Sequence, residues 1–252
     1  MDLTVAGLWR HPIKAIGAEP LEQTALMAGE TMPGDRVWAV AHAASKADTA
    51  DPKWLHSSNF NRGAQSPELM AIGATSDPAV GRVTLTHPRQ GEITLTPDRS
   101  ADQARLLAWL MPLVPENRPG PTAVYRVPGL GITDSPFPSI SIITTASLRA
   151  LEGKVGRPLD QRRFRCNIWL DGAGPWQEFE WVGKEAMLGT ARVRIVERSG
   201  RCLAPAANPE TGARDADILG ALEAGWGHTD FGVYAEVIAD GEVQTGDRFL
   251  PL

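Results

Sequence analysis

Cys202 is the residue whose type and setting most directly suggest chemistry in this sequence. It follows Gly200-Arg201, just after a β-patterned run, ARVRIVERS, at residues 191–199. A thiol at a strand end beside an arginine meets two conditions that lower a cysteine pKa, partial exposure and a nearby cation. A thiolate there could serve as a nucleophile or as a ligand for a soft metal. The same side chain could instead be a small buried hydrophobe.

The second cysteine, Cys166, has a different pattern around it. In FRCNI at 164–168, alternation puts Cys166 on one face with Phe164 and Ile168, which predicts a core position. The sequence holds no third cysteine, no CxxC pair and no Cys/His set with zinc spacing. A disulfide framework and a structural zinc site are therefore not expected.

Several basic residues lie at predicted strand ends beside turns. Lys14 follows a His-Pro-Ile segment, Arg36 follows a Gly-Asp pair, and Arg162, Arg163 and Arg165 crowd one strand entry. A β-scaffold positions binding residues at such places. If these cations converge, they form an anion site for phosphate or carboxylate. Each could also be a solvated or ion-paired surface charge.

Other catalytic signatures are absent from the sequence. The five histidines show no i,i+4 pairing and no HExxH spacing, and there is no GxSxG elbow. There is also no GxGxxG after a strand and no GxxxxGK[ST]. Neither a hydrolase triad, a dinucleotide-binding fold nor a P-loop is supported.

The composition narrows the possible partners and compartment. The 252 residues carry 25 Lys and Arg against 30 Asp and Glu, a net charge of −5, which disfavours general nucleic-acid binding. Two cysteines fit a reducing compartment at least as well as an oxidising one. The start, MDLTVAGLWR, shows no signal-peptide pattern, and no apolar run approaches the roughly 20 residues of a membrane-spanning helix. We expect a cytoplasmic protein with neither a nucleic-acid nor a membrane partner.

The positioning elements are expected to be short strands, because 25 glycines and 20 prolines break the chain often. In the first half, the pattern predicts a strand from residue 3 that stops before His11, followed by further β-patterned runs and a helix. These are strands at 21–27 and 36–42, a hairpin of 81–86 with 92–96, and a helix at 101–111.

A stretch dense in Pro and Gly at 112–138 is the best boundary candidate, and we divide the chain into domains 1–124 and 125–252. The elements expected after it are a helix at 146–154 capped by Thr145, strands at 164–170, 179–182, 191–197, 231–238 and about 247–250, and a short helix at about 216–224. Many short strands with few helices predict a mainly β (α+β) fold, with a β-rich barrel or sandwich in each half.

Seven segments in order resemble the molybdenum cofactor sulfurase C-terminal (MOSC) superfamily. They are HPIKA at 11–15, GDRVWAV at 34–40, RRFRCNI at 162–168, SGRC at 199–202, NPETG at 208–212, FGVYAEV at 231–237 and GEVQTGDRF at 241–249. The chain looks most like the two-domain type, represented by the amidoxime-reducing component and its bacterial relatives. The resemblance implies an N-terminal β-barrel domain, a MOSC β-barrel domain and a few short helices.

The resemblance also implies site residues. Cys202 matches the cysteine that ligates molybdenum in a molybdopterin cofactor (Mo-molybdopterin) and is the expected catalytic residue. Arg201 beside it is expected to bind the cofactor. The other matched positions, expected to bind cofactor, are Lys14, Arg36, Asp134, Ser135, Arg165 and Asn167. The chain departs from the family at Ala15 and Gly200, where relatives carry Ser, and at Cys166, where they carry Pro.

The function implied is that of a molybdenum-dependent oxidoreductase that reduces N-hydroxylated substrates, hydroxylamines and amidoximes, to their N–H forms. The sequence shows no iron–sulfur or flavin motif, so electrons would come from a separate protein, such as a cytochrome-b5-like protein, a ferredoxin or a flavin reductase. Two alternatives remain: a sulfur carrier that uses a Cys202 persulfide, and a non-catalytic module that binds or stores the cofactor.

Overall fold

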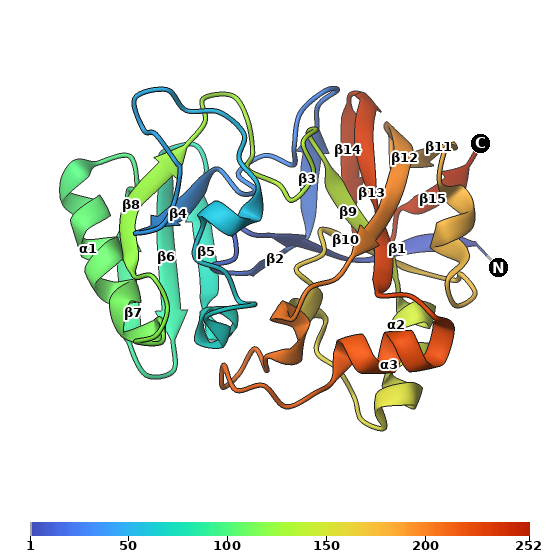
Figure 1. Cartoon of the computed structure of the whole chain (residues 1–252). Helices are drawn as coiled ribbons and strands as arrows, with labels where there is room; N and C mark the ends of the chain where they lie inside the picture. The colour runs from blue at the N-terminus through green and yellow to red at the C-terminus, as the bar shows by residue number, and fades with distance from the viewer. Residues whose placement is uncertain (1) are drawn as a thin grey trace.

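The computed structural model describes residues 2–252, and its largest feature is a closed seven-stranded barrel. The strands run in the order β10-β9-β13-β12-β11-β15-β1, and β1 pairs back with β10 to close the ring. Their bounds are β1 (Leu3–Arg10), β9 (Ile140–Thr144), β10 (Ile168–Asp171), β11 (Glu185–Leu188), β12 (Ala191–Gly200), β13 (Asp230–Ala239) and β15 (Arg248–Pro251). Since β1 comes from the start of the chain, the N-terminus is built into the C-terminal barrel (Figure 1).

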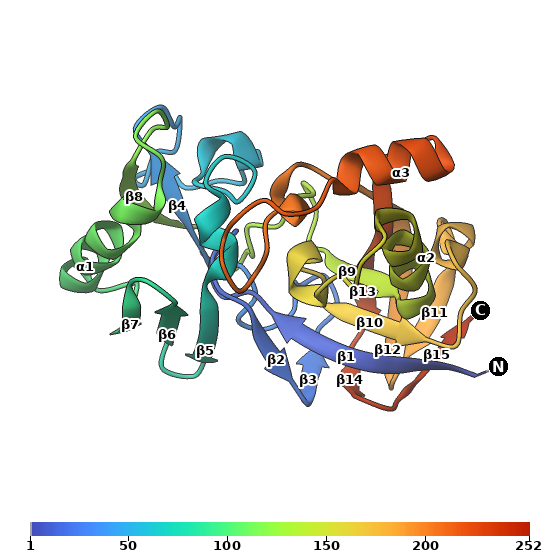
Figure 2. The ribbon, with the colours of Figure 1, turned by 90° about the horizontal axis from the view of Figure 1, so that it is seen from below.

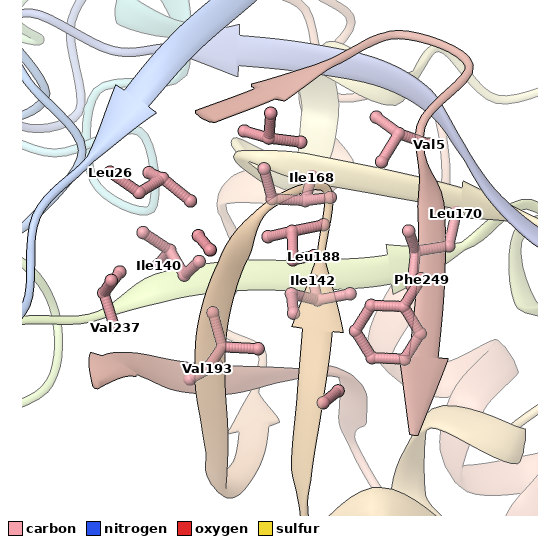
Figure 3. Close-up of a cluster of buried hydrophobic side chains, with 14 of the residues drawn as sticks. Val5, Leu26, Ile140, Ile142, Ile168, Leu170, Leu188, Val193, Val237 and Phe249 are labelled. Carbon is pink, nitrogen blue, oxygen red and sulfur yellow. The ribbon is translucent and has the colours of Figure 1, made fainter. Parts of the chain in front are cut away.

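Alternation along the strands fills the barrel. In β12, Ala191, Val193 and Ile195 are buried, whereas Arg192 and Arg194 between them are exposed. Figure 3 shows the resulting apolar cluster, in which side chains such as Val193 and Phe249 meet inside the ring. Burying a side chain of this kind contributes roughly 1.5–3 kcal/mol. The interior of the barrel is therefore a packed core.

The first part of the chain forms a second lobe beside the barrel (Figures 1 and 2). It has a two-stranded sheet, a three-stranded sheet and one helix: β4 (Trp38–His42) with β8 (Pro121–Arg126), β5 (Gly73–Asp77), β6 (Arg82–His87) and β7 (Gly91–Leu95) in series, and α1 (Ser100–Leu110). A separate apolar cluster, which includes Ile13, Leu69 and Leu106, forms the core of this lobe. β2 (Glu19–Leu21) joins the barrel sheet beside β1, and β3 (Gln23–Leu26) pairs with β14 (Gly241–Gln244).

Two helices pack on each other at one side of the barrel, α2 (Thr145–Val155) and α3 (Ile218–Trp226) (Figure 2). The Thr144 hydroxyl caps α2 by accepting from the Ser147 N–H, so the cap lies one residue before the predicted Thr145. Short 3-10 helices complete the chain at Ser57–Asn59, Pro67–Ala71, Met111–Leu113, Gln161–Phe164, Gln177–Trp181 and Ala204–Ala206. Within residues 2–252, no helix has both the length and the apolar character needed to cross a membrane.

The predicted mainly β fold with a few short helices is confirmed, while two predicted strands are wrong. Residues 179–182 lie in and just after a 3-10 helix, and of 164–170 only the end from Ile168 is strand. Short apolar runs do not separate strand from helix, and Arg165 adopts a left-handed backbone that interrupts the strand pattern. β8 crosses the predicted boundary between residues 124 and 125 while pairing with β4, and that boundary stays a prediction.

Candidate functional site

A cavity of about 390 Å³ opens between the two lobes. Lys14, Arg36 and Arg62 line it from the first lobe, and residues of the barrel side, including Cys202, line it from the other. Its size is that of a small-molecule or cofactor site. Six cationic side chains but only two carboxylates line it, so the cavity is positive although the chain carries a net charge of −5. An anionic ligand matches this surface.

Cys202 lies on this cavity and is exposed. β12 ends at Gly200, the Arg201 N–H still donates to the Thr229 carbonyl at 2.9 Å, and the chain then turns into the 3-10 helix Ala204–Ala206. The thiol therefore sits where the strand ladder stops, and the alternative of a buried apolar cysteine does not apply. A free, accessible thiol beside cations is suited to metal ligation or nucleophilic chemistry.

Lys14 is buried, and its three ammonium donors are all used within the protein. It donates to the Ile132 and Thr133 carbonyls, each at 3.0 Å, and to Asp134 Oδ1 at 2.6 Å. Burial lowers the pKa of Lys14, and the Asp134 carboxylate opposes that shift. Lys14 thus ties the first lobe to the loop before β9, and its role in this structure is to position that loop.

Asp134 is the carboxylate of this cluster. Burial raises its pKa, but Lys14, followed by Arg36 and Arg165, outweighs that effect and lowers the pKa to about 2. The group is therefore ionised at neutral pH. The neighbouring Ser135 is buried outside the cavity lining and donates to Ser139 Oγ at 2.6 Å. Ser135 therefore stabilises the loop without lining the cavity.

Arg36 and Arg165 interlock across the two lobes. Arg36 pairs with Asp35 and donates from Nη2 to the Arg165 carbonyl at 2.8 Å. Arg165 donates back to the carbonyls of Gly17 at 3.0 Å and Ile13 at 3.2 Å. Burial, followed by the Arg36 charge, lowers the pKa of Arg165 to about 9, so it stays cationic at neutral pH. The two guanidiniums are thereby held in place before any ligand arrives.

Non-glycine residues with a left-handed backbone are concentrated around this cavity. In residues 2–252, four non-glycine residues have a positive φ, and three of them, Ala15 (62°), Arg36 (51°) and Arg165 (48°), line this cavity. The left-handed region costs an L-residue roughly 1–2 kcal/mol. Strain of this kind clusters where a fold fixes functional groups. Its concentration here supports the choice of this cavity as the candidate functional site.

Asn167 and Cys166 lie behind the cavity surface. Asn167 accepts from the Ser141 hydroxyl at 2.9 Å, donates to the Trp9 carbonyl at 3.2 Å, and lines a small recess that shares Arg36 and Asp134 with the cavity. Cys166 is 1% exposed, and burial raises the pKa of its thiol to about 11. It therefore remains a protonated core residue, as its alternation predicted.

Arg201 holds the region around Cys202. Its guanidinium donates to the Phe164 carbonyl at 2.9 Å and from Nε to the Phe231 carbonyl at 2.8 Å. Of the eight predicted site residues, the cavity lining brings together Lys14, Arg36, Asp134, Arg165, Arg201 and Cys202, and leaves out Ser135 and Asn167.

Sequence reasoning missed a second group of lining residues, His56, Arg62, Glu197, Arg198 and Tyr234. His56 Nδ1 accepts from the Ser58 N–H at 3.2 Å, and burial raises the pKa of Tyr234 so that its hydroxyl keeps its proton. Tyr234 lies in one of the seven motif segments, FGVYAEV at 231–237, and Glu197 and Arg198 lie on the strand that leads to Cys202. His56 and Arg62 belong to no motif.

The residues that line the cavity fit a metal whose other ligands come from a cofactor. In the part of the chain that the structure describes, no group of three or more His, Cys, Asp or Glu side chains is arranged to hold a metal ion. The cavity instead offers one accessible thiol and several guanidiniums. These donors suit an anionic cofactor that itself supplies most of the ligands to a metal with soft ligands.

Comparison with known proteins places the chain in a family. A model of the MOSC domain matches residues 132–249, and a model of the MOSC N-terminal beta barrel domain matches residues 2–113. The chain belongs to the family of MOSC-domain proteins that carry this N-terminal domain. Mouse mitochondrial amidoxime-reducing component 1 is 24% identical over an alignment 248 positions long, and the alignment covers 84% of this chain and 68% of the mouse protein.

Two solved structures are also similar to this chain. The YuaD protein from Bacillus subtilis has 12% sequence identity and a TM-score of 0.47, covering 100% of this chain and 96% of its own. YiiM from Geobacillus stearothermophilus has 19% identity and a TM-score of 0.34, covering 45% of this chain and 53% of its own.

Proposed function

We propose that this protein binds a molybdenum cofactor in the cavity between its lobes, with Cys202 as the protein ligand to molybdenum, and reduces N-hydroxylated compounds. One observation carries the proposal: an exposed thiol and cations from both lobes line the same cavity. Membership of the MOSC family and the distant similarity to an amidoxime-reducing component support it.

Each lining residue has a distinct part in this proposal. The guanidiniums of Arg36, Arg165 and Arg201 provide fixed positive charge for the anionic groups of the cofactor. Lys14 and Asp134 hold the loop that forms one wall. Cys202 supplies the thiolate. When bound, the cofactor would supply two-electron redox chemistry at its metal.

The net reaction is R–NH–OH + 2 H⁺ + 2 e⁻ → R–NH₂ + H₂O. The N–O bond breaks, the nitrogen is reduced, and the oxygen leaves as water. The electrons come from a separate donor protein of the cytochrome-b5-like, ferredoxin or flavin reductase type. Tyr234 and His56 border the cavity and are the groups of this chain placed to hold or pass a proton there.

The test is a measurement of metal, cofactor and turnover on one preparation. Protein made in a host that synthesises molybdopterin should contain molybdenum and pterin fluorescence near a one-to-one ratio with the chain. It should convert benzamidoxime to benzamidine with reduced methyl viologen as electron source. Bound cofactor without turnover of any hydroxylamine or amidoxime would support the storage module instead, and absence of molybdenum would contradict both readings.

The exposure of Cys202 also favours a second candidate, a sulfur carrier. A cysteine desulfurase persulfide would pass its outer sulfur to Cys202, giving a Cys202 persulfide and returning the desulfurase thiol. Mass spectrometry of the intact protein after incubation with a desulfurase and cysteine separates the two. A gain of one sulfur atom, lost in Cys202→Ala, supports the carrier, whereas an unchanged mass excludes it.

A further inference from the structure

Residues 203–215, which follow Cys202, form a loop that we call the strap. It begins with the 3-10 helix Ala204–Ala206, and the chain then doubles back, because Ala207 pairs with Arg214 in an isolated β-bridge. The strap therefore starts beside the thiol, leaves it, and returns close to its own beginning.

A buried arginine holds the strap at both ends. Arg163 is 3% exposed, and its Nη1 donates to the carbonyls of Pro205 at 3.2 Å and Ala206 at 3.3 Å. Its Nη2 donates to Asp215 Oδ1 at 2.7 Å. One planar, pre-organised guanidinium thus ties the start of the strap to its end, in a place where water competes little for these bonds.

Asp215 is the acceptor that completes this clamp. Its N–H donates to the Ala206 carbonyl at 3.0 Å, and its Oδ2 accepts from Asn208, the first residue of the NPETG motif, at 2.8 Å. Arg157 also contacts Asp215, at 3.2 Å, but its side chain is 45% exposed. Among the described residues, Arg157 donates to no other part of the strap, so it lacks the carbonyl contacts of Arg163.

The far side of the strap packs on the first lobe. Arg214 Nη2 donates to the Ala64 carbonyl at 2.8 Å, and Ala64 itself lines the cavity. Gly212 is buried with a φ of 72°, and a Cβ there would lie 2.6 Å from Glu68 Cα. Only glycine allows this approach of the two backbones. The strap, orange in Figures 1 and 2, therefore links the barrel side to the first lobe beside the cavity.

Cys202 lies between two anchored points of the chain. On one side, Arg201 donates to the Phe164 carbonyl at 2.9 Å, and on the other, Pro205 accepts from Arg163. Arg163 and Phe164 are neighbours in one 3-10 helix, so a single turn fixes the backbone before and after the thiol. The exposed thiol itself stays available to a metal.

We propose that Arg163 and Asp215 are positioning residues for Cys202: they fix the strap, and the strap fixes the place from which the Cys202 thiol binds molybdenum. This inference rests on the proposed function and adds to it two residues that do not line the cavity. Substituting a residue that orients a metal ligand typically lowers metal affinity by about 10–100-fold.

The first test uses metal-free protein with a nitroxide spin label on Cys202, whose EPR line shape reports how freely that part of the chain moves. We expect Arg163→Met to make the label clearly more mobile, because two carbonyls and a carboxylate lose their shared donor. Arg157→Met removes an exposed arginine from the same carboxylate and should leave the label unchanged. Asp215→Asn, which keeps the side-chain shape, should act in the same direction as Arg163→Met and decides the question if Arg163→Met does not fold.

The second test measures molybdenum per folded chain in protein from a host that makes molybdopterin. We expect about a tenfold loss in Arg163→Met and less than about a twofold loss in Arg157→Met. Arg163→Lys keeps the charge without the planar fork and should retain more molybdenum than Arg163→Met.

A label as immobile in Arg163→Met as in the unmodified protein overturns the inference, and so does undiminished molybdenum in that variant. Equal effects of Arg157→Met and Arg163→Met also overturn it, because the carbonyl contacts would then play no part. If the unmodified protein holds no molybdenum, the proposed function fails, whereas a difference in label mobility between the two arginine variants still supports the clamp on Cys202.

Discussion

Two groups of cavity-lining residues differ in how their polar groups are used. We call the cluster of Lys14, Arg36, Asp134 and Arg165 the inner part, and Arg198 with the exposed Cys202 the mouth. In the inner part, Lys14 and Arg165 donate to loop carbonyls of the opposite lobe, and Lys14 also donates to the Asp134 carboxylate. At the mouth, the Arg198 guanidinium stacks on the Phe179 ring, and Cys202 is exposed. A charged group that is paired within the protein helps to fix the shape of a site. A charged group without such a partner is available to bind a ligand. We therefore expect the inner part to contribute more to the stability of the fold than the mouth does, whereas the exposed thiol at the mouth is available to a ligand.

The largest contrast is expected between the two thiols. Cys202 should react with iodoacetamide in the native protein, whereas Cys166, which is 1% exposed, should react only when the barrel opens. Since opening of a stable domain is rare, the rates should differ by more than about 1,000-fold. Peptide mass spectrometry over a time course measures both rates. Comparable labelling of Cys166 in native protein would contradict its placement in the core.

Substitution of Lys14 should have the largest effect on stability. Lys14→Met leaves Asp134 and two loop carbonyls without their shared donor, which should cost about 3 kcal/mol. Urea unfolding measures this free energy. Lys184→Met, at an exposed lysine outside the cavity, is the control and should change little. A loss below about 0.5 kcal/mol for Lys14→Met would mean that the inner part does not hold the lobes together.

Acid should weaken the inner part through Asp134. Its folded-state pKa of about 2 lies below the ordinary value of 3.8, so its carboxylate stabilises the fold above pH 3.8, and this contribution is lost as pH falls through 2. Urea midpoints measured from pH 5 down to pH 2 should fall more steeply for the unmodified protein than for Asp134→Asn. Parallel curves would contradict the coupling of Asp134 to Lys14.

The smallest effect on stability is expected at the mouth. Arg198→Met removes a guanidinium with no ion-pair partner among the described residues, so unfolding free energy should change by at most about 0.5 kcal/mol. A stability loss as large as that of Lys14→Met would remove the distinction between the two parts of the cavity.

The sequence predicted the elements whose pattern is local. β12 and the β6–β7 hairpin alternate along one buried face, and both were found near their predicted positions. β9 was missed because ISIIT is buried throughout and pairs in parallel with β10, so it shows no alternation. The residues at 179–182 were misassigned because a short apolar run has no distinctive period.

Site residues at strand ends could be predicted from the sequence, whereas contacts that form only when the chain folds could not. Cys202 and Arg36 stand beside turns that the sequence displays. The partners of Lys14, by contrast, lie about 120 residues away in the chain, at Ile132, Thr133 and Asp134. Arg62 belongs to a loop without a motif, and only the docking of the lobes brings it to the cavity of Cys202.

The most direct test of the central claim is the molybdenum content of two matched variants. Cys202→Ala removes the exposed thiol at the cavity, and Cys166→Ala removes the buried thiol behind it. Purified from a host that makes molybdopterin, the unmodified protein and Cys166→Ala should carry near-equal molybdenum per folded chain, and Cys202→Ala should lose most of it. Undiminished molybdenum in Cys202→Ala would contradict the assignment of Cys202 as the metal ligand.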